Sequence, residues 1–125
     1  MLKAQWEKVV QELFDTQEIP EVNEQRLKTF REYLGNTLKH PCYLFTANDD
    51  SISFEPLLLL YCLEEVDENK GIYVYVKRDS DKKNLVVPLT ELQCPVEDGS
   101  NHILIDSFCT WFIHASYRKL CVQID

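Results

Sequence analysis

Residues 71–78 read GIYVYVKR, and this stretch decides the fold class. Its β-branched residues alternate with Tyr73 and Tyr75, so one face of an extended chain is aliphatic and the other aromatic. The charged run Asp79–Asn84 follows as a hairpin turn. Leu85–Leu89 is the return strand, and Pro88 marks where its strand pattern ends. The stretch therefore predicts an antiparallel hairpin.

Two amphipathic helices are predicted on the N-terminal side of this hairpin. Apolar residues recur at helical spacing from Leu2 to Phe14, which indicates a first helix ending near Asp15. The second is expected from Glu21 to Lys39, where Pro41 stops it. The apolar face of the second helix comprises Leu27, Phe30, Leu34 and Leu38.

Two further strands are expected between the second helix and the hairpin that begins at Gly71. Cys42–Ala47 has a β-like pattern, Asn48–Ser51 has the composition of a turn, and Leu57–Leu63 is a short apolar run that begins after Pro56. Thr90–Asp98 is read as a connector without regular structure. The sheet is therefore expected to be small and largely antiparallel.

A third helix is predicted after the turn-like residues Asp98–Asn101. Its apolar face comprises Leu104, Phe108, Trp111, Phe112 and Ala115. The tail Lys119–Ile124 alternates and is expected to add an edge strand. The order of elements predicts an α+β fold with two N-terminal helices, a small sheet and a C-terminal helix, and residues 1–125 are expected to form a single domain.

Composition excludes several classes of function. The net charge of −8 argues against nucleic-acid binding and against an anionic membrane surface. The longest apolar run, Pro56–Leu63, is far shorter than the roughly 20 residues that cross a bilayer, and the N-terminus lacks the apolar core of a signal peptide. A cytoplasmic location is expected. The five widely spaced cysteines are interpreted as reduced core residues, not as a disulfide framework.

Carboxylates dominate the middle of the chain. Between Lys39 and Lys70 there are seven Asp or Glu residues and no Lys or Arg, although the same stretch contains two predicted core strands. Carboxylates held close together repel one another, and a hard cation relieves that repulsion. The predicted Ca²⁺ ligands are Asp49, Asp50, Glu64, Glu65, Asp67 and Glu68. The alternative is a solvated acidic face without a bound ion.

Other chemistries find little support in the sequence. EF-hand loops started at Asp67 or at Asp79 lack the required acidic residues and glycine, so a calcium site here is not an EF-hand. No nucleophile elbow or glycine-rich phosphate loop is present, and the chain is not expected to be an enzyme. Asp79 and Asp81 are expected to be neutralised by neighbouring Lys and Arg residues. Asp106 is expected to be a hydrogen-bonded acid at the edge of the core.

Several runs of the chain resemble a known bacterial family. They are Gly71–Lys83, Val87–Leu92 and Asn101–Phe112, together with the His-Pro-Cys run that ends at Cys42. These motifs resemble the small calcium-binding proteins of cyanobacteria over roughly residues 38 to 115. The resemblance implies an acidic protein that binds Ca²⁺ through carboxylates outside EF-hands. The six carboxylates named above come from their clustering and not from transfer of the family's ligands.

Two hypotheses follow from these observations. The first is a calcium-binding protein that acts as a Ca²⁺ buffer or regulator. The second is an acidic interaction module, of the inhibitor or immunity type, that docks on a basic protein partner. The same carboxylates would steer association in the second case, and that steering would weaken in any salt.

Overall fold

The described residues fold into three α-helices and a five-stranded antiparallel sheet, which confirms the predicted α+β class. The computed structural model describes residues 4–46 and 55–124, with side chains described up to residue 115. The sheet order is β4-β3-β2-β1-β5. The elements are α1 (Gln5–Phe14), α2 (Glu24–Thr37), β1 (Tyr43–Thr46), β2 (Leu57–Asp67), β3 (Gly71–Arg78), β4 (Asn84–Pro88), β5 (Leu92–Gln93) and α3 (Ser100–Ile124), with short 3₁₀ helices at Leu89–Glu91 and Val96–Asp98.

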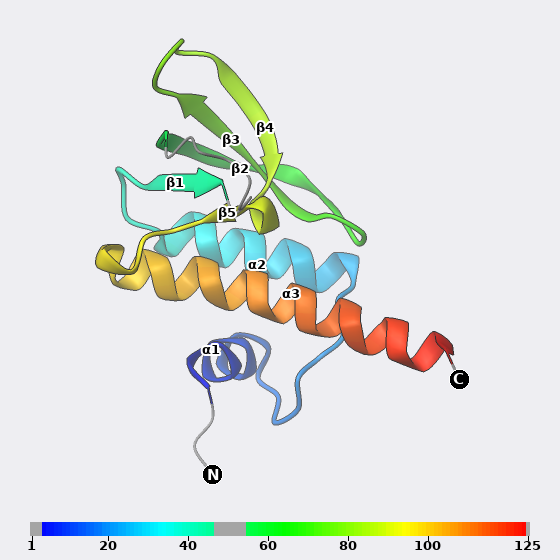
Figure 1. The fold of residues 1–125 in the computed structure, drawn as a ribbon. Coiled ribbons are helices and arrows are strands. Elements are labelled where there is room, and N and C mark those ends of the chain that lie inside the picture. Colours follow the sequence, from blue (N-terminus) through cyan, green and yellow to red (C-terminus); the bar gives the residue numbers. More distant parts are fainter. Residues whose placement is uncertain (1–3, 47–54, 125) are drawn as a thin grey trace.

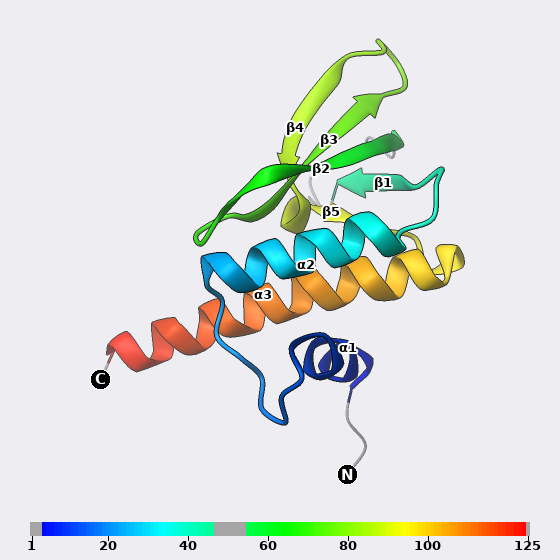
Figure 2. The same cartoon turned by 180° about the vertical axis from the view of Figure 1, so that it is seen from behind.

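The elements stack in layers, as Figures 1 and 2 show from opposite sides. Helices α2 and α3 lie side by side against one face of the sheet, and α1 packs on α3 on the side away from the sheet. The alternation in β3 explains this arrangement, because Ile72, Val74 and Val76 are fully buried beneath the helices. Tyr73 and Tyr75 belong to the opposite face and are half-buried.

An aromatic cluster joins the layers. The indole of Trp111 in α3 stacks on Phe30 of α2, with ring centroids 5.5 Å apart, and lies 5.3 Å from the ring of Phe14 in α1. Phe108, one turn earlier in α3, meets Phe30 edge-on at 5.1 Å. Trp111 also donates its Nε1–H to the carbonyl of Pro20, at 2.9 Å. The apolar faces predicted for the second and third helices therefore meet in one core.

A buried amide fixes the chain between α2 and β1. Asn101, which is 5% exposed, accepts a hydrogen bond from the backbone N–H of Lys39 and donates one to its carbonyl, both at 2.8 Å. This pair of bonds satisfies a backbone segment that leaves α2 before entering the sheet. The first turn of α3 is thereby tied to the start of β1.

The C-terminal tail was predicted wrongly. Residues 119–124 continue α3 as far as Ile124 and do not form an edge strand. Extending an existing helix requires no new nucleation, whereas an edge strand must form new long-range pairings. The predicted connector between the return strand and α3 contains β5, which pairs with β1. The predicted turn Asn48–Ser51 lies outside the described residues.

Two glycines offer a matched test of the packing. Gly71 has φ of +88°, and a Cβ there would lie 3.2 Å from Phe108 Cζ and 3.4 Å from Phe112 Cε1. We expect Gly71→Ala to lower the free energy of unfolding by about 1–3 kcal/mol because it adds backbone strain to a crowded contact.

Gly35, inside α2, is the matched control. A Cβ there meets nothing within 4 Å, so Gly35→Ala should raise stability by about 0.5–1 kcal/mol through helix propensity. Urea unfolding of both variants measures the two effects. Equal stability of Gly71→Ala and the native chain would contradict the packing of β3 against α3.

Candidate functional site

Four of the six predicted calcium ligands lie together at one end of the β2–β3 hairpin. Glu64 and Glu65 are exposed residues near the end of β2, Asp67 is the half-buried last residue of that strand, and Glu68 is exposed in the turn that follows. Asp49 and Asp50 lie outside the described residues. The described part of the chain therefore places Glu64, Glu65, Asp67 and Glu68 as one acidic end of the hairpin.

A large bulge in β2 exposes the two adjacent glutamates. Cys62 pairs with Val74 and Val66 with Ile72, so the three residues 63–65 stand opposite the single residue Tyr73. Such an insertion bends the strand and leaves backbone groups unpaired in the ladder.

Arg31 of α2 supplies partners for those groups. Its Nε donates to the carbonyl of Leu63 at 2.8 Å, and its Nη2 donates to the carbonyl of Cys62 at 3.2 Å. Sequence analysis missed this role because no local pattern links an arginine in a helix to a strand so far along the chain. Arg31 thus supports the segment that carries Glu64 and Glu65.

Asp67 has a structural task in the hairpin turn. Its Oδ1 accepts hydrogen bonds from the backbone N–H groups of Asn69, at 2.7 Å, and Lys70, at 3.2 Å. Aspartate commonly shapes turns in this way. The turn then enters β3 through Gly71, whose positive φ suits glycine. One oxygen of this predicted ligand is therefore already engaged by the backbone.

The acidic end of the hairpin has no side-chain ion pair within the described residues. The described residues form ion pairs elsewhere, namely Lys28–Glu24 at 3.5 Å, Arg78–Asp81 at 2.7 Å and Lys82–Asp79 at 3.0 Å. None involves Glu64, Glu65, Asp67 or Glu68. Carboxylate oxygens are the donors that Ca²⁺ prefers, so the residue types at this end match the predicted ion.

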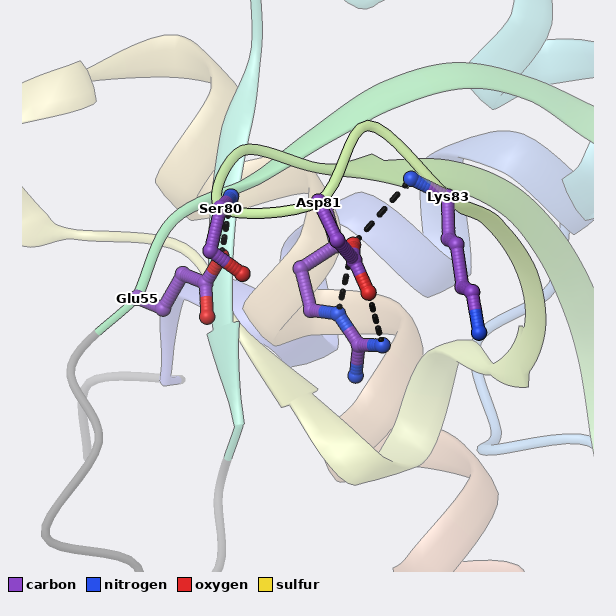
Figure 3. Close-up of polar contacts among 5 residues, drawn as sticks. Glu55, Ser80, Asp81 and Lys83 are labelled. Atoms are coloured by element: carbon purple, nitrogen blue, oxygen red, sulfur yellow. Dashed lines mark hydrogen bonds and ion pairs between the residues drawn. The ribbon is translucent and has the colours of Figure 1, made fainter.

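The β3–β4 hairpin shows the opposite electrostatics, as Figure 3 illustrates. Arg78 donates from Nε and Nη2 to the two carboxylate oxygens of Asp81, at 3.0 and 2.7 Å, and the N–H of Lys83 adds a third bond at 3.1 Å. The Arg78 hydrogen bonds, followed by that of Lys83, lower the pKa of Asp81 to about 2. Glu55 accepts a hydrogen bond from the N–H of Ser80 in the same turn. The expectation that Asp79 and Asp81 are neutralised by neighbouring cations is confirmed.

Strand register places the end of β1 far from the acidic end of the β2–β3 hairpin. Tyr43 pairs with Leu58 and Leu44 with Leu57, so the chain leaves β1 at Thr46 beside the start of β2. Glu64 stands roughly 20 Å further along the strand at about 3.3 Å per residue. No group of three His, Cys, Asp or Glu side chains among the described residues is arranged to hold a metal ion. The six-carboxylate set therefore stays a prediction.

The cysteines are buried thiols. Cys42, Cys62 and Cys94 belong to the core, and Cys109 is half-buried against it. Burial raises the pKa of Cys42 to about 11 and the pKa values of Cys94 and Cys109 to about 12. Thiols with such pKa values are protonated at neutral pH and are poor nucleophiles. The interpretation of these four as core residues is confirmed, whereas Cys121 lies where side chains are not described.

One acidic residue was predicted wrongly. Asp106 is exposed on α3, and the described residues provide no hydrogen-bond partner for it. The helical phase explains the error, because Asp106 falls between the core positions Ile105 and Ser107 but points to solvent. Asp106 is therefore not an acid at the edge of the core.

Comparison with known proteins supports the fold. No protein-family model matches the chain, and no curated protein matches it significantly. Among solved structures, the crystal structure of Anabaena CcbP matches with a TM-score of 0.61 at 17% sequence identity, covering 89% of this chain and 92% of that one. At this identity the likeness shows a shared fold. None of the described helices is long and apolar enough to cross a membrane.

The Arg78–Asp81 pair predicts a defined titration. The lowered pKa means that the pair stabilises the fold above the ordinary carboxyl pKa of 3.8, and that this contribution is lost as the pH falls toward 2. We expect Arg78→Gln to raise the Asp81 pKa toward 3.8, as measured by carboxyl NMR. Lys82→Gln is the control, because Lys82 pairs with Asp79 and should leave Asp81 unchanged. An unshifted Asp81 in Arg78→Gln would refute the assignment.

Proposed function

We propose that the chain is a calcium-binding protein without catalytic activity, which acts as a Ca²⁺ buffer or regulator. The observation that carries this proposal is the sequence resemblance to the small calcium-binding proteins of cyanobacteria. The match to a structure from the cyanobacterium Anabaena over nearly the whole of both chains supports it, because the two chains share a fold.

The acidic end of the β2–β3 hairpin is the best described location for the ion. Glu64, Glu65 and Glu68 offer carboxylate oxygens that no described cation neutralises. Ca²⁺ takes six to eight oxygen ligands, so backbone carbonyls and water would complete the shell. Asp67 would contribute only the oxygen that the turn leaves free. Asp49 and Asp50 lie outside the described residues, so the two groups of acids are tested separately.

The mechanism we propose is charge compensation. A bound Ca²⁺ would supply a positive charge to Glu64, Glu65 and Glu68, which form no ion pair with a described residue. Glu64 and Glu65 are adjacent in a bulge held by Arg31, and Glu68 lies in the turn held by Asp67. Relief of their repulsion would tighten the hairpin and change the charge of the neighbouring surface.

Thermal unfolding provides the first test of calcium binding. Metal-stripped protein is melted in EDTA, in excess Mg²⁺ and in excess Ca²⁺. A ligand at about 100 times its Kd stabilises the folded state by roughly 2.7 kcal/mol, so we expect a rise of several degrees in Tm with Ca²⁺ alone. Addition of NaCl at matched ionic strength is the control. Identical Tm values in all conditions would exclude specific calcium binding at the concentrations tested.

Paired variants locate the ligands. We expect Glu64→Gln combined with Glu65→Gln to weaken calcium binding at least tenfold in calorimetric titration, because each change removes a charged oxygen donor. Asp49→Asn combined with Asp50→Asn tests the other half of the predicted set. Asp79→Asn is the matched control, since that carboxylate is already paired with Lys82. Native affinity in both double variants would show that the assigned carboxylates are wrong.

A further inference from the structure

The face of the sheet that points away from the helices is aromatic and exposed. Tyr61 in β2 pairs with Tyr75 in β3, which pairs with Val86 in β4, so these three side chains form a continuous row across the sheet. Tyr43 in β1 and its partner Leu58 continue the same face. Tyr43, Tyr61 and Val86 are 43%, 53% and 56% exposed. We call Tyr43, Leu58, Tyr61, Tyr75 and Val86 the open face.

This composition is unusual for a sheet surface in contact with water. Antiparallel sheets with one covered face usually place polar side chains on the other. Here the rings of Tyr61 and Tyr75 lie 5.2 Å apart and shield each other only in part. Tyrosine is enriched at protein interfaces because a rigid ring with a polar tip gives contact area at little entropic cost. Contiguous exposed apolar surface of this kind marks interaction sites.

The charges around the open face indicate the kind of partner. Lys77, opposite Leu58, is the one cation that the strand register places among these residues in the described chain. At the other end of β3, the bulge with Glu64 and Glu65 stands opposite Tyr73, two residues from Tyr75. Both glutamates are exposed and lack an ion pair with any described residue. The net charge of −8 has the same sign.

A groove beside Tyr61 adds a place for an anchoring side chain. It has a volume of about 340 Å³, lies between α2 and β2, and is lined in part by Glu32, Gly35, Leu60 and Tyr61. The missing side chain of Gly35 leaves part of this space open, since a Cβ there would touch nothing within 4 Å. The lining also includes Arg31 beside Glu32, together with Leu34, Leu38 and Leu59, so the groove suits an apolar side chain of the partner and not a basic one.

We infer that the open face docks a basic segment of another protein, in which arginines alternate with apolar residues. Arginine is favoured because its planar guanidinium stacks on tyrosine rings and also pairs with carboxylates such as Glu64 and Glu65. The apolar residues of the segment would cover Leu58 and Val86. A second copy of this chain is disfavoured as the occupant, because each copy carries a net charge of −8. The inference goes beyond calcium binding and does not require the ion.

The experiment measures binding of a short synthetic peptide of alternating arginine and leucine, in EDTA, by calorimetry. We expect the native chain to bind it, and Tyr61→Ala combined with Tyr75→Ala to weaken binding about tenfold without altering the charge of the protein. Ile113→Ala, which removes an exposed apolar side chain from α3, should leave the affinity unchanged. Glu64→Gln combined with Glu65→Gln should weaken binding and reduce its salt dependence.

Four results would overturn the inference. If the tyrosine variant binds the peptide as tightly as the native chain does, the open face is not the binding site. If a peptide with glutamate in place of arginine binds as tightly as the arginine peptide, the partner is not a basic segment. A native dimer that the tyrosine variant converts to a monomer, measured by light scattering, would assign the face to a second copy. NMR of the native protein keeps the test decisive if the tyrosine variant unfolds, because peptide should shift the ring signals of Tyr61 and Tyr75, and unshifted rings would refute the docking.

Discussion

The packing of Trp111 against Phe30 is the contact on which the rest of the structure depends. The indole joins α3 to α2, the ring of Phe14 brings α1 to the same point, and the bond to the Pro20 carbonyl fixes the chain between α1 and α2. Phe108 extends the cluster to the sheet, because it lies against Gly71 where β3 begins. Burial of such large rings dominates core energetics, so three helices and the hairpin are held by a single apolar assembly.

The two hairpins that leave this core differ in how they treat charge. The β3–β4 turn balances its acids, with Arg78 on Asp81 and Lys82 on Asp79. At the end of the β2–β3 hairpin, Glu64, Glu65 and Glu68 have no such partners in the described chain. Arg31 donates its hydrogen bonds to backbone carbonyls of the bulge instead. Arg31 thus supports the shape of the acidic end without forming an ion pair with its glutamates, which is an arrangement that an external cation or a basic partner would complete.

The calcium proposal and the docking proposal meet at this bulge. Glu64 and Glu65 stand beside the open face, opposite Tyr73. An ion held by these glutamates would lower the negative charge next to the surface that we assign to a basic segment. The two binding events would then oppose each other, and by thermodynamic linkage each would weaken the other by the same factor. Calcium control of the open face is a consequence of the two proposals taken together.

The sequence by itself determined the class of fold and most of the core. The period of two in residues 72–77 and the helical spacing of Phe30, Leu34, Phe108 and Trp111 are local signals that survive in the structure. It also identified the neutralised acids Asp79 and Asp81, whose partners are close in the chain. Only the tertiary structure decided that the tail is helical, that Arg31 supports the bulge, and that Tyr61, Tyr75 and Val86 form one row. These features depend on strand register and on contacts between residues distant in sequence, which no local period specifies.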